Sequence, residues 1–140
     1  MAQLNYQVLK ESGYKGYILE SAPEKVMQFG EGNFLRAFVD DFIDIANEKA
    51  GFNGKVVLVQ PIAQGLTDLI NQQQGLYTLY LRGSEKGVKV DDKRVISCVS
   101  RCLDPYRDWQ AVLDFASVVL DTITSRSSDR AKSSTACQSR

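Results

Sequence analysis

Residues 55–60, Lys-Val-Val-Leu-Val-Gln, constrain the fold more than any other stretch of the sequence. Four successive aliphatic residues without polar alternation predict a strand that is buried on both faces, as strands of parallel sheets are. Parallel neighbours need a crossover connection, which is usually a helix. This strand therefore predicts an α/β fold built around a parallel sheet.

The preceding segment completes a βαβ unit. Residues 25–29, Lys-Val-Met-Gln-Phe, form a compact run that ends in a glycine turn, and they predict a first buried strand. A helix is expected from Phe34 to about Lys49, closed by Gly51 and Gly54. Strand, glycine turn, helix and strand within about 35 residues predict a right-handed unit.

One apolar stripe runs along the predicted helix, and it is expected to face the core. Its members recur at three- and four-residue steps: Leu35, Phe38, Val39, Phe42, Ile45 and Ala46. The polar residues Asp40, Asp44, Asn47 and Glu48 lie mainly off this stripe. Asn33 is the expected N-cap.

The following segments predict a short helix, a hairpin and another helix. Residues 65–74 form the short helix, with Leu66, Leu69 and Ile70 on one face. Strands are expected over 76–82 and 94–101, and the polar segment 83–93 between them predicts a hairpin-like insertion. Asp104-Pro105 is expected to cap a helix that Trp109 anchors in the core.

Composition excludes several classes of protein. Seventeen basic residues balance seventeen acidic ones, which argues against a nucleic-acid partner bound through a general basic field. No apolar run approaches the length of a membrane span, and no signal peptide is evident at the N-terminus. The odd set Cys98, Cys102 and Cys137 suggests free thiols in a reducing cytoplasm. The absence of histidine excludes histidine bases and histidine metal ligands, and we expect no metal site.

The glycine turn at residues 30–33 has the chemistry of a phosphate site. Small residues let a phosphate approach the backbone, and free N–H groups at a helix N-terminus favour an anion. The pattern is only G-x-G, because Leu35 stands where the usual third glycine would be. The alternative is a tight turn that merely joins strand to helix. The βαβ context favours a dinucleotide site.

Gln60 ends the second strand, where an acid usually holds the ribose hydroxyls. Glutamine can also bond a hydroxyl, but it does not repel a 2′-phosphate. The choice between NAD and NADP is therefore open from the residues alone.

Three segments resemble the mannitol dehydrogenase family, and its altronate branch most closely. They are Val26 to Asp40, Val56 to Ile62 and Gly75 to Gly83. That family has G-x-G-x-F-x-R-A in place of the third glycine, so Leu35 is no departure within it. The altronate branch is marked by Phe-Gly-Glu-Gly-Asn-Phe-Leu-Arg, whereas mannitol and mannonate relatives tend to have His before the Arg. The resemblance extends over about residues 5–116.

The resemblance implies the first part of a Rossmann-type dinucleotide-binding domain with a β-hairpin insertion. It implies NAD as cofactor, a small-molecule sugar acid as substrate, and reversible hydride transfer between D-altronate and D-tagaturonate in hexuronate catabolism. The carried-over cofactor-binding residues are Met27, Gln28, Phe29, Gly30, Glu31, Gly32, Asn33, Phe34, Leu35, Arg36, Ala37 and Phe38. For Arg36, an ion pair with a sheet carboxylate is as plausible as a phosphate contact.

Family members are several times longer, and their helical second domain brings the catalytic lysine. We therefore expect residues 1–118 to be a partial NAD-binding domain, residues 119–140 to be a disordered or frameshifted tail, and the catalytic domain to be absent. The tail has nine Ser/Thr among residues 121–140 and one large apolar residue, Ile123.

No catalytic residue is assigned within the chain. Six of its nine lysines fall at polar positions that predict exposure: Lys25, Lys49, Lys55, Lys86, Lys89 and Lys93. Two alternatives to an altronate enzyme remain. One is another polyol or hexonate dehydrogenase of the same family, and the other is a non-catalytic nucleotide-binding remnant. The residues say nothing of oligomeric state.

Overall fold

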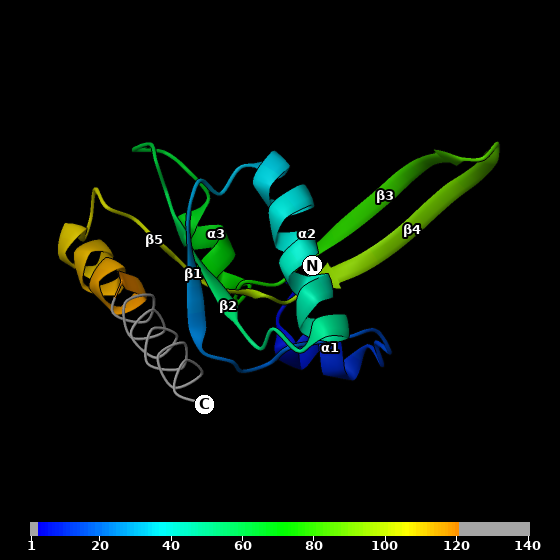
Figure 1. Cartoon of the computed structure of the whole chain (residues 1–140), viewed down its shortest axis with the longest axis horizontal. Helices are drawn as coiled ribbons and strands as arrows, with labels where there is room; N and C mark the ends of the chain where they lie inside the picture. The colour runs from blue at the N-terminus through cyan, green and yellow to red at the C-terminus, as the bar shows by residue number, and fades with distance from the viewer. Residues whose placement is uncertain (1–2, 121–140) are drawn as a thin grey trace, which may run out of the picture.

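A computed structural model describes residues 3–120, except for the side chain of Glu85. Of the tail expected at 119–140, residues 119 and 120 belong to a helix, so its predicted start is wrong, and residues 121–140 lie outside the described residues. Two sheets organise the fold. The first is three-stranded and parallel, in the order β1-β2-β5, and the second is the antiparallel pair β3-β4 (Figure 1). The predicted α/β fold with a hairpin insertion is confirmed.

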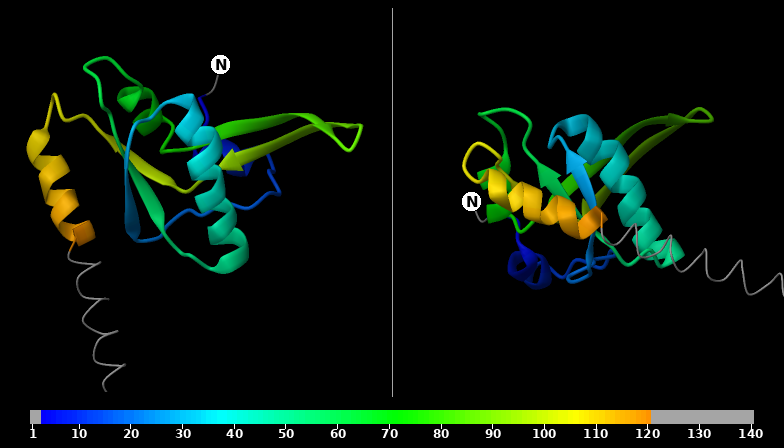
Figure 2. Two further views of the ribbon diagram at one scale, coloured as in Figure 1. Left: turned by 45° about the horizontal axis from the view of Figure 1, so that its top comes forward. Right: turned by 60° about the vertical axis from the view of Figure 1, so that its left-hand side comes forward.

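The parallel sheet is built from β1 (Glu24–Phe29), β2 (Lys55–Val59) and β5 (Val99–Leu103). All five residues of β2 are buried, as the run of aliphatic residues predicts. Helix α2 (Asn33–Ala50) connects β1 to β2, and Gly51 ends it in the left-handed conformation at φ +64°. A further helix over residues 109–120, orange in Figure 1, lies on the other side of the parallel sheet from α2 (Figure 2, left).

The hairpin joins β3 (Tyr77–Glu85) to β4 (Val88–Ile96) and extends well beyond the rest of the molecule (Figure 1). Its turn residues Lys86 and Gly87 both have positive φ, at 51° and 80°, as a two-residue hairpin turn requires. The expected strand over 94–101 is in fact two strands in different sheets. The chain bends at Ser97, whose N–H and hydroxyl both donate to Asp44 at 2.9 and 3.1 Å.

Two short helices complete the fold. Helix α3 (Thr67–Gln72) buries Ile70 but leaves Leu69 44% exposed, so the predicted three-residue apolar face is only partly right. Helix α1 (Tyr6–Glu11) was not expected. The Asn5 side chain accepts from the Val8 N–H at 2.9 Å and caps it, and Leu9 is its one buried residue.

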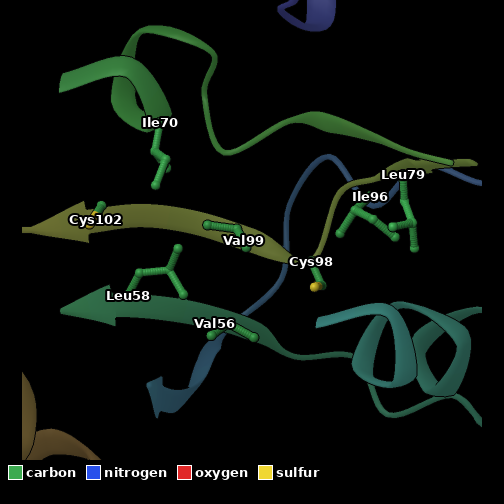
Figure 3. Packing of buried hydrophobic residues seen from close by; sticks show 8 residues of the cluster. All are labelled: Val56, Leu58, Ile70, Leu79, Ile96, Cys98, Val99 and Cys102. Carbon is green, nitrogen blue, oxygen red and sulfur yellow. The ribbon is translucent and has the colours of Figure 1, made fainter. Parts of the chain in front are cut away.

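The main core lies where β2 and β5 meet α3 and the base of the hairpin (Figure 3). Its buried members are Val56, Leu58, Ile70, Leu79, Ile96, Cys98, Val99 and Cys102. Cys98 and Cys102 are free and buried. Burial raises the pKa of the Cys98 thiol, so it packs as an apolar residue rather than reacting.

The structure overturns the expected orientation of α2. The buried residues of this helix are Asp40, Asp44 and Asn47, whereas Phe38 and Phe42 are more than half exposed. The polar face turns inward because it finds partners there. Asn47, for example, exchanges two 2.9 Å hydrogen bonds with the backbone of Gly54.

Helix 109–120 begins one turn later than expected. Asp104 accepts from the Tyr106 N–H at 2.9 Å and so caps a turn, while Asp108 accepts from the Ala111 N–H at 3.0 Å and caps the helix. Val112 and Phe115 are its buried residues. Trp109 is 58% exposed and is not the core anchor that the sequence predicts.

Candidate dinucleotide-binding site

The glycine turn lies at the carboxyl end of β1, between the strand and α2, where ligands of open α/β sheets bind. Gly30 adopts φ +117°, and its N–H donates to the Val59 carbonyl at 2.9 Å. A side chain at Gly30 would be strained by that φ and would meet Leu35 at 2.8 Å. The turn is therefore tied to the end of β2 and needs glycine at this position.

The N-terminus of α2 is open for an anion. Its N-cap is Gly32, no side chain caps it, and no acidic residue lies in its first turn. The expected N-cap, Asn33, is instead the first helical residue, and its side chain accepts from Arg36 Nη2 at 2.7 Å. A Cβ at Gly32 would meet nothing within 4 Å, so open space lies beside the free N–H groups.

Two buried polar side chains, those of Gln28 and Glu31, contact the turn or the loop packed against it. Gln28 is 7% exposed, and its Nε2 donates to the Gly30 carbonyl at 3.2 Å. Glu31 is 5% exposed and lies against Gly65. A Cβ on Gly65 would collide with the side chains of both Glu31 and Gln60, so this glycine lets the loop after β2 pack down on the turn. Sequence analysis did not single out Gly65, because only the folded chain brings it to the turn.

Gln60 does not present its amide to a ligand. The side chain is 2% exposed. Its Nε2 donates to the Ile62 carbonyl at 2.8 Å, and its Oε1 accepts from the Thr67 hydroxyl at 2.8 Å. In this arrangement both ends of the amide have partners within the protein, and Gln60 orders the loop that leads to α3.

An apolar pocket of about 430 Å³ opens beside the turn, at the carboxyl ends of β1 and β2. It is lined by Phe29, Val59, Gln60, Pro61, Pro105, Tyr106 and Trp109. The rings of Phe29, Tyr106 and Trp109 are each more than half exposed. Flat aromatic walls suit a planar heteroaromatic ring. The aromatic residues after β5 were not predicted as part of the site, because their approach to β1 depends on strand order.

Arg36 lies beside the hairpin rather than in an ion pair. Its guanidinium stacks over the Tyr77 ring, 5.3 Å from the centroid. None of the ion pairs among the described residues includes Arg36, and its Nε is buried without a hydrogen-bond partner. Of the two alternatives for Arg36, the ion pair with a sheet carboxylate is therefore not formed. Whether Arg36 contacts phosphate stays a prediction.

Asp40 and Tyr77 form a buried pair behind the first turns of α2. The Tyr77 hydroxyl is 2.7 Å from the Arg36 carbonyl and 3.1 Å from Asp40 Oδ2. Burial raises the pKa of Asp40 to about 6, and burial beside this carboxylate raises the pKa of Tyr77. Tyr77 thus connects the hairpin to the helix that follows the turn.

One predicted surface lysine is buried. Lys55 is 5% exposed, its Nζ donates to the Tyr6 hydroxyl at 2.9 Å, and burial lowers its pKa. Burial also raises the pKa of Tyr6 to about 12. Lys55 begins β2, at the end of the sheet opposite the glycine turn, so the pair joins α1 to the sheet and does not face the site.

Comparisons with known proteins decide the family. Residues 24–136 match the sequence profile described as the mannitol dehydrogenase Rossmann domain. The chain belongs to this family. The altronate oxidoreductase of Halalkalibacterium halodurans is 42% identical over 117 residues, which are 83% of this chain and 23% of that relative. That of Bacteroides thetaiotaomicron is 51% identical over 84 residues, or 60% of this chain and 18% of the relative.

Solved structures of the mannitol dehydrogenase type share the fold. Mannitol 2-dehydrogenase of Pseudomonas fluorescens, solved with NAD and D-mannitol, superposes with a TM-score of 0.65 at 24% identity. A substrate-free D-sorbitol dehydrogenase gives 0.62 at 18% identity. Each covers 81% of this chain and 24% of the larger protein. The chain thus spans about a quarter of the length of its relatives or less.

No helix within residues 3–120 combines the length and apolar character that crossing a membrane requires.

Proposed function

We propose that this chain binds NAD at the glycine turn, as the dinucleotide-binding part of an enzyme that interconverts D-altronate and D-tagaturonate. The observation that carries the proposal is the uncapped N-terminus of α2, which follows a positive-φ glycine at the end of a parallel strand. Free N–H groups and the helix dipole at this point favour a pyrophosphate.

The residues present fit the two chemical parts of the adenosine diphosphate half of NAD. Gly30, Gly32 and Asn33 would approach the pyrophosphate, and the wider segment 27–38 would surround it. The aromatic pocket at Phe29, Tyr106 and Trp109 would take the adenine ring. When bound, NAD supplies the hydride acceptor, and these side chains bind and orient it.

Support for altronate as substrate class comes from the relatives. The relatives named above are altronate oxidoreductases, and they are 42% and 51% identical to this chain over 117 and 84 residues. The segment Phe29 to Arg36, which marks that branch, forms the turn itself. Because the chain spans 23% or less of these relatives, the substrate belongs to the proposal.

Binding is tested by fluorescence titration, because Trp109 is the single tryptophan and lines the pocket. NAD should quench its emission. Gly32→Val should weaken NAD binding at least ~10-fold, since a side chain there blocks backbone approach to the phosphate. Gly83→Val is the matched control, because a Cβ at Gly83 in the hairpin also meets nothing within 4 Å. Equal affinity of the two variants would refute the site, and a parallel titration with NADP measures cofactor preference.

We further propose that the 140-residue chain alone does not catalyse the reduction of tagaturonate by NADH. Hydride transfer to a carbonyl needs a proton donor within hydrogen-bond reach of the substrate oxygen. Among the described lysines, the one buried residue, Lys55, lies at the wrong end of the sheet. Absorbance of NADH with tagaturonate should therefore stay constant, and turnover near that of a full-length relative would contradict this assignment.

A further inference from the structure

Strand β2 ends without the carboxylate that commonly holds the adenosine ribose in dinucleotide sites. An acidic residue at this point accepts a hydrogen bond from the ribose 2′-hydroxyl, and its charge repels a 2′-phosphate. Here Gln60 follows the strand, and its Oε1 already accepts from the N–H and the hydroxyl of Thr67, at 3.3 and 2.8 Å. A ribose partner must therefore come from another segment of the chain.

The glycine turn brings a carboxylate to the same place. Glu31 is 5% exposed. A Cβ on Gly65, in the loop after β2, would collide with both Glu31 Oε1 and Gln60 Oε1, so both oxygens lie beside this glycine. Glu31 thus reaches from the end of β1 to the end of β2, and it puts a negative charge next to Gln60.

Within residues 3–120 the Glu31 carboxylate has no hydrogen-bond donor. None of the ion pairs or side-chain hydrogen bonds of these residues includes it. Its neighbour Gln60 Oε1 is itself an acceptor and cannot satisfy it. A buried carboxylate is unfavourable without donors, and the hydroxyl groups of a ligand would supply them.

The proposed position of NAD brings hydroxyl groups to this carboxylate. The adenosine ribose joins the adenine to the pyrophosphate, so it would lie between the aromatic pocket and the N-terminus of α2. Gln60 lines that pocket, and Glu31 directly precedes Gly32, the N-cap of α2. The ribose is therefore the part of the cofactor that would pass Glu31.

The charges around the end of β2 disfavour a phosphate on that ribose. Arg107, in the segment after β5, donates to both carboxylate oxygens of Asp68 at 2.6 and 2.9 Å, and its Nε is 3.2 Å from Asp104. The charge of this arginine is thus compensated, whereas that of Glu31 is not. A 2′-phosphate here would meet uncompensated negative charge.

We infer that Glu31 is the specificity-determining residue of the dinucleotide site: its carboxylate accepts hydrogen bonds from the adenosine ribose and excludes the 2′-phosphate of NADP. The inference rests on the proposed function, because that function places the ribose between the pocket and the turn. It deepens the proposed function by assigning the choice between NAD and NADP to a side chain of the turn.

The test compares NAD and NADP by quenching of Trp109 in three chains: unmodified, Glu31→Gln and Glu24→Gln. The unmodified chain should prefer NAD. Glu31→Gln should lower the ratio of the two affinities at least ~10-fold, because the amide has no charge to repel the phosphate. Glu24→Gln is the matched control, since it removes the same charge at the opposite end of β1, where Glu24 pairs with Arg101 at 2.9 Å. Its ratio should equal that of the unmodified chain.

A second measurement on the unmodified chain needs no substitution. NAD that lacks the adenosine 2′-hydroxyl should bind at least ~10-fold more weakly than NAD, because it loses a hydrogen bond to a charged acceptor. Glu31→Ala should bind the two ligands alike. Each comparison uses two ligands on one protein sample, so a loss of stability alone would not produce the difference, and thermal melting verifies that the variants fold.

Two outcomes would overturn the role of Glu31 and leave the proposed function standing. One is NAD binding that depends on Gly32 while Glu31→Gln keeps the unmodified ratio of NAD to NADP affinity. The other is equal affinity of the unmodified chain for NAD and its 2′-deoxy analogue. Failure of the unmodified chain to bind NAD would instead overturn the proposed function and this inference with it.

Discussion

Strand β2 and helix α2 are joined by a short turn, yet they bury opposite kinds of residue. The five residues of β2 are entirely buried, and four of them are aliphatic. Helix α2 buries two aspartates and an asparagine and exposes three phenylalanines. β2 has a strand on each side and a helix over each face (Figure 2). Within residues 3–120, α2 is covered on the side where Tyr77, Arg94 and Ser97 supply partners, and its phenylalanine side is exposed. Burial of a helix face thus depends on which neighbours are present.

The largest change in the free energy of unfolding is expected from a substitution in the buried polar face of α2. Asp44 is fully buried and holds Arg94 and Ser97. Asp44→Ala should lower the free energy of unfolding by about 4 kcal/mol, because Arg94 loses its buried partner. Urea denaturation measures it. Glu48→Ala removes the more exposed partner of the same arginine and should cost less than about 1 kcal/mol. Similar losses for both variants would contradict the role given to Asp44.

The next largest change in the free energy of unfolding is expected from a substitution in the apolar strand β2. Leu58 is 0% exposed in the middle of β2, and Leu58→Ala should cost about 3 kcal/mol through lost burial and a residual cavity. The same denaturation experiment applies. A loss below about 1 kcal/mol would mean that the core between β2 and α3 is loosely packed.

Asp40, on the buried polar face of α2, should make the free energy of unfolding depend on pH. Its pKa is raised from 3.8 to about 6 in the folded chain, so folding favours the protonated form. The free energy of unfolding should therefore fall as pH rises from about 4 to about 6. Asp40→Asn should remove this dependence and stabilise the chain at pH 7 by about 2 kcal/mol, because no charge is left to bury. Stability curves at several pH values test it, and a variant less stable at pH 7 would refute the sign.

The smallest effect is predicted at the three exposed phenylalanines of α2, which are Phe34, Phe38 and Phe42. Phe38→Ser should change the free energy of unfolding by less than about 0.5 kcal/mol in the isolated chain, because the ring is already half exposed and its partners are other surface rings. Denaturation of the chain alone measures this. A loss comparable to that of Leu58→Ala would show that these exposed rings contribute to the stability of the chain as much as a core residue does.

Several features were predictable because they depend on local chemistry. The aliphatic run of β2, the glycine turn before α2 and the polar hairpin tip all follow from residue type and spacing. Others were missed because the deciding partner is distant in sequence. The predicted strand over 94–101 divides at Ser97 because Asp44, fifty-three residues earlier, binds it there. Lys55 is buried because Tyr6 from α1 covers it.

The candidate site divides in the same way. The turn residues 30–33 could be located from the sequence, because a glycine pair between a strand and a helix has a local conformational cause. Gly65, Tyr106 and Trp109 could not, since nothing in the sequence brings the segments after β2 and β5 to the end of β1. The hydrogen bonds of the Gln60 amide to Thr67 and Ile62 could not be foreseen either, because they form only in the folded chain.

By itself the sequence determined that this protein has a parallel βαβ unit with a glycine turn between its first strand and its helix, because hydrophobic period and glycine placement act over a few residues. Tertiary structure alone decided which face of α2 is buried. An amphipathic pattern indicates that two faces of a helix differ, but it does not indicate which face is buried, because buried polar groups are stable wherever they find partners. The partner of Asp40 comes from the hairpin, that of Asp44 from the bend at Ser97, and that of Asn47 from the turn at Gly54.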